Sequence, residues 1–155
     1  FLCFLLSLDI VDKNNIGCIG HSMGGVRCIY LAAIDKRIKT TAISGAVSNL
    51  KQEVNSGIFH TWLTILPGIG KHTETSGILS LISPRPLVIV YTENDPIFLA
   101  TEAKKQIDQV QKVYQRLDQE SNFLSIYLPN EEHIFPIKSH EGVYSFFDKN
   151  LKNKK

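Results

Sequence analysis

A glycine-rich turn with a serine at its centre constrains this chain more than any other feature. Residues 20–24 read Gly-His-Ser-Met-Gly, after an apolar run at 16–19 and before a stretch with apolar residues at helical spacing. A serine on a tight strand-to-helix turn exposes its hydroxyl at the end of a sheet, and glycines permit the close backbone approach of such a turn. The context therefore predicts a nucleophile elbow with Ser22 as the nucleophile.

The helix expected after the elbow begins at Met23. Its first backbone N–H groups have no partner within the helix and would face the reaction centre, so the Met23 N–H is a candidate oxyanion donor. A phosphate-binding loop instead requires Lys followed by Ser or Thr after its second glycine, and here Val26 and Arg27 follow Gly25. Nucleotide binding is therefore disfavoured, and a structural turn without chemistry is the remaining alternative.

Strand-like and helix-like segments alternate along the whole chain. We expect strands at residues 16–19, 40–47, 87–91 and 123–128, and helices at 23–34, from Ala103 onward and at the C-terminus. The helix from Ala103 has a stripe of apolar residues: Ala103, Ile107, Val110, Tyr114 and Leu117. The terminal helix has another: Val143, Phe146, Phe147 and Leu151. This alternation predicts an α/β fold with a parallel sheet.

Composition limits the chain to one modest unit. With 155 residues and 43% hydrophobic content, we expect a single domain over residues 1–155. A formal charge of +2 gives no reason to expect a nucleic-acid partner. Cys3, Cys18 and Cys28 stand in apolar segments without disulfide or metal-ligand spacing, so we expect reduced core residues, no metal and no cofactor.

The first residues are apolar and suit the end of a buried helix over 1–8. Residues 1–6 are too few to span a membrane, and they lack the basic flank and cleavage site of a signal peptide, so we expect no membrane span. Phe1 is not an initiator Met, which leads us to expect further residues upstream. The compartment stays open, with the cytoplasm as the default.

Residues 48–83 show no steady periodicity and form a long insertion between predicted strands. Phe59, the single tryptophan Trp62 and a turn-forming run at 67–70 lie within it. Long irregular insertions often form caps or pocket walls, so Phe59 and Trp62 are candidate substrate-binding residues. The alternative is plain packing, with a short helix at 78–82.

A catalytic serine needs a base, and the base needs an acceptor that holds its tautomer. Asp95 and His133 each follow the end of a predicted strand, and Ser44 and Gly45 near the end of another are expected to face the same place. The carboxyl ends of parallel strands are where α/β proteins build their sites. We therefore predict a catalytic triad of Ser22, His133 and Asp95.

Other residues compete for these roles. Glu93 stands two residues before Asp95 and is an alternative acid. His21 is adjacent to Ser22 and is expected to line the substrate pocket or to pack. The histidines at 60, 72 and 140 have the character of ordinary surface or core residues.

Two further motifs, Ser-Pro-Arg-Pro-Leu at 83–87 and Asn-Asp-Pro-Ile-Phe at 94–98, join the elbow in a family resemblance. Together they resemble the α/β-hydrolase superfamily, nearest to its dienelactone-hydrolase-like and acetylxylan-esterase-like branch, over nearly all the chain. The resemblance implies the same triad and one oxyanion donor at Met23. Family members commonly have glycine before the catalytic histidine, whereas Glu132 precedes His133.

These features predict a serine hydrolase that cleaves a small-molecule carboxylic ester through an acyl-enzyme on Ser22. Thioesterases and peptidases use the same machinery, so the fold does not decide between them. The rival class is a non-catalytic binding protein that retains the fold.

The resemblance also implies that the chain is the C-terminal part of its fold. About half the sheet and the second oxyanion donor would then lie upstream of residue 1. We therefore expect residues 1–155 alone to be inactive, with an exposed, aggregation-prone edge at strand 16–19.

Overall fold

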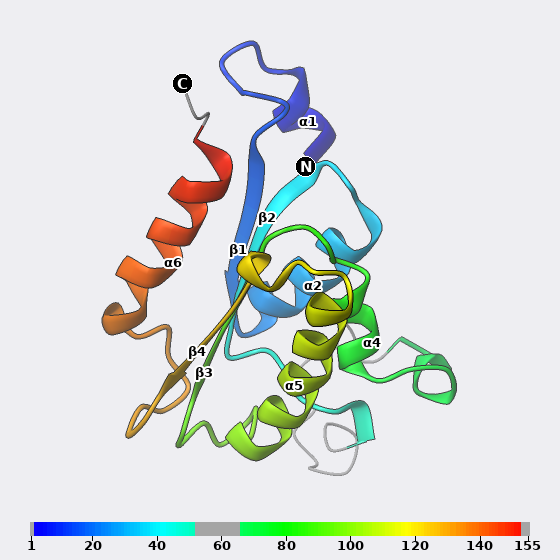
Figure 1. The fold of residues 1–155 in the computed structure, drawn as a ribbon, viewed down its shortest axis with the longest axis vertical. Helices are drawn as coiled ribbons and strands as arrows, with labels where there is room; N and C mark the ends of the chain where they lie inside the picture. Colours follow the sequence, from blue (N-terminus) through cyan, green and yellow to red (C-terminus); the bar gives the residue numbers. More distant parts are fainter. Residues whose placement is uncertain (1, 52–65, 153–155) are drawn as a thin grey trace.

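A parallel sheet forms the centre of the computed structural model, which describes residues 2–51 and 66–152. Its four strands are β1 (Ile16–His21), β2 (Ile38–Ser44), β3 (Leu87–Thr92) and β4 (Phe123–Leu128). They lie in the order β1-β2-β3-β4, and every neighbouring pair is parallel. All four carboxyl ends consequently meet at one edge of the sheet, as seen in Figure 1.

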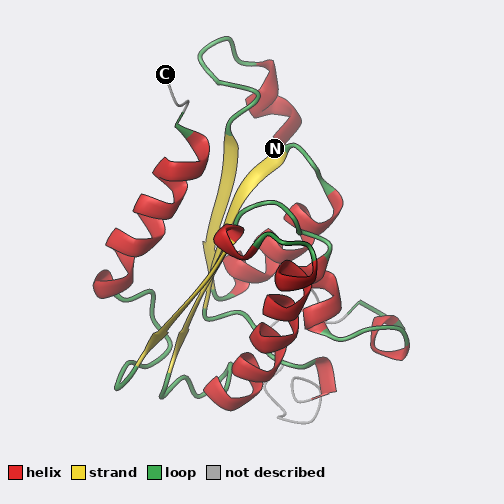
Figure 2. Ribbon diagram, viewed as in Figure 1, coloured by secondary structure: helices red, strands yellow, loops and turns green. Residues whose placement is uncertain are grey.

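Helices cover both faces of this sheet. The helices given for the described residues are α1 (Leu2–Ser7), α2 (Met23–Ile34), α4 (Thr75–Ser80), α5 (Ala100–Arg116) and α6 (Ile137–Leu151), with short 3-10 turns η1 (Ile69–Lys71) and η2 (Glu120–Asn122). Side chains of α2, α4 and α5 share one buried cluster, whereas α6 packs in a second cluster on the opposite face (Figures 1 and 2). The predicted α/β architecture is confirmed.

β3 is buried on both faces. Leu87 and Ile89 belong to the cluster under α2, α4 and α5, while Val88 and Val90 belong to the cluster under α6. None of the four is more than 2% exposed. An uninterrupted apolar run is the pattern of a strand covered on both faces, and the prediction of a central strand here is confirmed.

The apolar stripe of α5 is also confirmed in most of its length. Ala103, Ile107, Val110 and Tyr114 are all buried. The helix begins at Ala100, three residues before the stripe, and apolar spacing does not reveal these three residues because none of them is buried. Leu117 is 47% exposed and caps the helix, so its assignment to the stripe was wrong.

Two strand boundaries differ from the prediction. β1 continues beyond residue 19 to His21, because Gly20 and His21 pair with the last residues of β2. β2 runs over Ile38–Ser44 instead of 40–47. It ends where Gly45 takes a φ of +52°, a left-handed conformation that turns the chain out of the sheet.

The predicted burial of the N-terminal segment is wrong. α1 is a helix, but none of its residues is buried, and Phe4 is 63% exposed. It lies beyond the amino ends of β1 and β2 (Figure 1), where neither face of the sheet can cover it. Cys3 is therefore an exposed thiol next to the Arg37 guanidinium, in contrast to the buried Cys28.

Arg85, from the Ser-Pro-Arg-Pro motif, closes the C-terminal end of α2. Its guanidinium donates to the carbonyls of Ala32 at 2.6 Å, Asp35 at 3.1 Å and Ile38 at 2.8 Å. The last carbonyls of a helix have no partner within it and carry partial negative charge, so a half-buried cation suits this position. Tyr114 fixes the Arg85 backbone by donating its hydroxyl to the Arg85 carbonyl at 2.6 Å.

We expect Arg85→Leu to lower the free energy of unfolding by about 2–3 kcal/mol, because it leaves several carbonyls without a charged donor. Urea denaturation measures the change. Arg116→Leu, at the exposed end of α5, is the control and should change stability by less than about 0.5 kcal/mol. Equal losses in the two variants would contradict the capping role.

Candidate active site

Ser22 occupies a strained turn between β1 and α2. Its φ is 55° and its ψ is −126°, a conformation that costs a non-glycine residue on the order of 1–3 kcal/mol. Two backbone hydrogen bonds hold it: the Ser22 N–H donates to the Ser44 carbonyl at 2.9 Å, and the Ser22 carbonyl accepts from the Val26 N–H at 3.0 Å. The strand, turn and helix predicted around residues 20–24 are present.

The glycines of the turn have different reasons to be there. A Cβ on Gly20 would lie 2.2 Å from the Gly24 carbonyl oxygen, and one on Gly25 would lie 2.5 Å from the Ala46 Cβ. A Cβ on Gly24 would meet no atom of the described residues within 4 Å. Gly20 and Gly25 thus let α2 approach the sheet, whereas Gly24, the second glycine of the sequence pattern, is not required sterically here.

Three side chains from separate strand ends form one hydrogen-bonded chain. His133 Nε2 lies 2.8 Å from Ser22 Oγ, and His133 Nδ1 lies 2.7 Å from Asp95 Oδ2. Ser22 follows β1, Asp95 follows β3 and His133 follows β4. The structure therefore brings together the three residues that the sequence singles out as a triad.

The Asp95 carboxylate is fixed by its own turn. Its Oδ1 accepts backbone N–H groups from Ile97 and Phe98, both at 2.9 Å. Its side chain is 1% exposed, so these donors replace water around the charge. With Oδ1 occupied in this way, Oδ2 is held in one orientation toward His133.

Glu93, the alternative acid, points elsewhere. Its carboxylate accepts the Asn130 backbone N–H at 2.8 Å and also the Tyr127 hydroxyl. Two backbone hydrogen bonds join the same two segments. The Glu93 N–H donates to the Leu128 carbonyl at 3.0 Å, and the Asn94 N–H donates to the Glu131 carbonyl at 2.9 Å. Glu93 therefore ties the turn that holds Asp95 to the loop that holds His133, and Asp95 alone of the two acids faces the imidazole.

The unusual Glu-Glu-His sequence of the histidine loop has a local role. The Glu131 carbonyl is the acceptor for Asn94, and its carboxylate pairs with Lys138 at 3.1 Å. The Ile134 N–H donates to the Glu132 carbonyl at 2.8 Å, which closes the loop around His133. The geometry of this loop thus does not need a glycine at position 132.

His21 packs against the triad histidine. The two ring centroids are 4.7 Å apart, and His21 Nδ1 lies 3.2 Å from the Ser44 hydroxyl. Burial lowers the pKa of His21, and the nearby His133 lowers it further. Of the two roles expected from the sequence, the described contacts show packing.

Two more residues border the His133 ring. Gly45, expected to face the site, leaves so little room that a Cβ there would be 3.3 Å from the imidazole. Phe98 stacks on His133, with centroids 5.7 Å apart at an angle of 23°. Phe98 was not predicted as a site residue from the sequence, although its place three residues after Asp95, in an Asp-Pro turn, was an available signal.

The predicted insertion at 48–83 is described only in part, and Phe59 and Trp62 lie outside the described residues. Its first residues are anchored: the Asn49 amide donates to the Glu102 carboxylate, and the Leu50 N–H donates to the Glu74 carboxylate at 3.0 Å. The end of the insertion forms α4, whose Ile78 and Leu79 are buried in the core. For this part, packing is the observed role.

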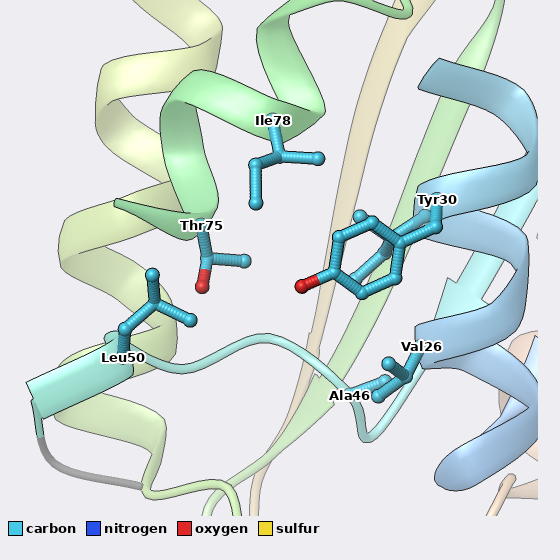
Figure 3. Close-up of a pocket in the computed structure, with 7 residues that line it drawn as sticks. Val26, Tyr30, Ala46, Leu50, Thr75 and Ile78 are labelled. Atoms are coloured by element: carbon cyan, nitrogen blue, oxygen red, sulfur yellow. The ribbon is translucent and has the colours of Figure 1, made fainter. Parts of the chain in front are cut away.

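A small cavity lies between α2, α4 and the chain after β2. Figure 3 shows the Tyr30 hydroxyl pointing into it toward Thr75. It measures about 10 Å³, room for about one water molecule. Its walls are Val26, Ile29, Tyr30, Ala46, Leu50, Thr75 and Ile78. The cavity is too small for an acyl group, and its lining comes from residues other than the triad.

The described ranges contain neither a metal site nor a membrane-spanning helix. Residues 2–51 and 66–152 contain no group of three or more His, Cys, Asp or Glu side chains placed to hold a metal ion. In the same ranges, no helix has both the length and the apolar character needed to cross a lipid bilayer.

Similarity to a solved structure accompanies this geometry. The chain superposes on the glucuronoyl esterase from Solibacter usitatus with a TM-score of 0.77 and 15% identity, over 98% of the chain and 46% of that protein. The chain has the α/β-hydrolase fold. Methylesterase BT1017 gives a TM-score of 0.73 at 23% identity, over 94% of the chain and 32% of its own. The glucuronoyl esterase catalytic domain of Hypocrea jecorina gives 0.77 at 17%, over 94% and 46%.

A relative found by sequence is also named as a hydrolase. The chain is 30% identical over 121 residues to the Bacillus subtilis (strain 168) protein named "Putative hydrolase YtaP". The match takes in 73% of the chain and 38% of that protein, so the chain spans well under half the length of this relative. No model of a known protein family matches the chain.

The two glycines of the elbow pattern should respond differently to alanine. Gly20→Ala is expected to lower the free energy of unfolding by about 3 kcal/mol, because the new Cβ would collide with backbone. Gly24→Ala should leave stability unchanged or raise it by up to about 1 kcal/mol through helix propensity. Chemical denaturation of both variants checks this, and a large loss in Gly24→Ala would show that this glycine is needed by a contact outside the described residues.

Proposed function

We propose that the protein is a serine hydrolase that cleaves a carboxylic ester through an acyl-enzyme on Ser22. The continuous hydrogen-bonded chain from Asp95 through His133 to Ser22 is the observation that carries this proposal. The α/β-hydrolase fold adds support, because its relatives include proteins named as esterases.

In the acylation step, Ser22 Oγ attacks the ester carbonyl carbon while its proton passes to His133 Nε2. The imidazolium gives that proton to the leaving alkoxide, so an alcohol departs and the acyl group remains on Ser22. Asp95 accepts from the Nδ1–H of His133, which keeps Nε2 available as the base and stabilises the imidazolium. The position of the carboxylate is already set by the N–H groups of Ile97 and Phe98.

In the deacylation step, His133 takes a proton from water as the water oxygen attacks the acyl carbon. The proton returns to Ser22 Oγ, and a carboxylic acid is released. In both steps the carbonyl oxygen becomes negative. The backbone N–H of Met23, the first residue of α2, is the proposed donor to it, aided by the positive end of the helix dipole.

The ester class is the finer part of the proposal. Two kinds of structural relative are named as a methylesterase and as glucuronoyl esterases. The Sporotrichum thermophile glucuronoyl esterase is described in complex with methyl 4-O-methyl-β-D-glucopyranuronate, a methyl ester of a sugar acid. A carboxylic ester is the chemistry these names share, and the likeness to dienelactone-hydrolase-like and acetylxylan-esterase-like enzymes fits the same class. A thioester or peptide substrate is an outcome that the assay below separates.

The triad predicts a specific pattern of losses in the whole protein. Ser22→Ala and His133→Ala should each reduce hydrolysis of p-nitrophenyl acetate by at least about a thousandfold, and the double variant should lose no more than either. Asp95→Asn should lose less than Ser22→Ala, because the serine and the imidazole remain. The methyl ester of glucuronic acid, a short acyl thioester and a short peptide, assayed in parallel, assign the substrate class.

Matched controls come from residues outside the site. Ser7→Ala, in the exposed α1, and His72→Ala, after η1, should retain full activity. A fluorophosphonate should label the wild type at Ser22 and leave Ser22→Ala unlabelled. A wild-type protein that is neither labelled nor active would favour the binding-protein alternative, and full activity in either alanine variant would refute the triad.

A further inference from the structure

Building on the proposed function, we propose that His21 is a positioning residue, which holds the His133 imidazole against the end of β1 so that Nε2 stays aligned with Ser22 Oγ. The residue does not touch the reacting atoms in this role. It acts through the ring of His133.

His21 is well placed to act on His133. As the last residue of β1, it lies opposite Ser44 in the sheet register, and its Nδ1 is 3.2 Å from the Ser44 hydroxyl. Its ring also packs against that of His133, with the two ring centroids 4.7 Å apart. One side chain of the elbow strand β1 thus contacts both the neighbouring strand β2 and the histidine loop.

Three other contacts that hold the histidine loop come from the acid side of the site. Asp95 binds His133 Nδ1, Glu93 binds the Asn130 N–H, and Asn94 donates to the Glu131 carbonyl. All three follow β3. His21 belongs instead to the strand that carries the nucleophile, so it fixes the position of the His133 base relative to Ser22.

Gly45 lets the two imidazoles pack close to its backbone. A Cβ on this residue would lie 3.0 Å from His21 Cε1 and 3.3 Å from both Cε1 and Nδ1 of His133. The Gly45 N–H donates to the Val90 carbonyl at 3.1 Å, which ties this backbone to β3. His21 and His133 therefore pack beside the same anchored residue.

The charge state of His21 fits a positioning role. Its lowered pKa, caused first by burial and then by His133, keeps the ring neutral. A neutral imidazole keeps one donor and one acceptor, and either can serve the hydrogen bond to the Ser44 hydroxyl. A neutral neighbour also adds no positive charge beside the imidazolium that forms on His133 during the reaction.

Kinetics separates positioning from substrate contact. His21→Phe keeps a ring of similar size but loses the hydrogen bond to Ser44, and we expect kcat to fall by about 10-fold to 100-fold with KM unchanged, because misalignment affects the transition state. His21→Asn retains a polar atom near the position of Nδ1 and should recover part of kcat. His140→Phe, at a half-buried histidine packed on Phe135 and Tyr144, is the control and should match the wild type.

A spectroscopic readout makes the test independent of turnover. The His133 Nδ1–H, hydrogen-bonded to Asp95, should give a downfield proton resonance that His21→Phe broadens through faster exchange and His140→Phe leaves unchanged. If the wild type proves inactive while this difference persists, the esterase proposal fails and the positioning role stands.

Three results would overturn the positioning role. These are a wild-type kcat together with a wild-type resonance in His21→Phe, a raised KM at unchanged kcat, and an equal fall of kcat in His140→Phe. If His21→Phe does not fold, Ser44→Ala replaces it. That variant removes the partner of Nδ1 and leaves the His21 ring, so kcat should fall in the same direction by a smaller factor, and an unchanged kcat would refute the proposal.

Discussion

The parallel register of the sheet is the constraint on which the site depends. Because β1, β2 and β3 run in the same direction with His21 opposite Ser44 and Ser44 opposite Val90, their carboxyl ends are level. Ser22 leaves this edge directly, and Asp95 and His133 leave it in short turns. Backbone pairing of the strands thus brings Ser22 and His133, which are 111 positions apart in sequence, within hydrogen-bond distance of each other.

Much of the architecture could be predicted from the sequence because it is periodic. β4 has the predicted limits, and the core of β3 and the stripe of α5 were identified from apolar spacing alone. The triad residues were identified for a different reason. A serine on a glycine-flanked turn, followed along the chain by an acid and a histidine after successive strands, combines local turn chemistry with the topology of a parallel sheet.

What could not be predicted depends on contacts between distant segments. The end of β2 is set by the conformation of Gly45, and α1 is exposed because it lies beyond the sheet, which no apolar count reveals. Asp95 was predicted over Glu93, but the hydrogen bonds that separate the two acids were not: two N–H groups orient the Asp95 carboxylate, and the Asn130 N–H binds the Glu93 carboxylate. The contact of His21 with His133 joins strand β1 to a loop more than a hundred residues later.

The strained backbone of Ser22 has a consequence for how such a chain evolves. Glycine adopts a φ of 55° without steric cost, so a glycine at this position would relieve strain in the turn. Asp95 would keep its two N–H donors and its histidine after that change, and no buried charge would lose its partner. Selection for folding alone would therefore not preserve the serine. In a gene copy released from selection for catalysis, position 22 should change first. The result would be a stable, inactive descendant that keeps the hydrogen-bonded pair of Asp95 and His133.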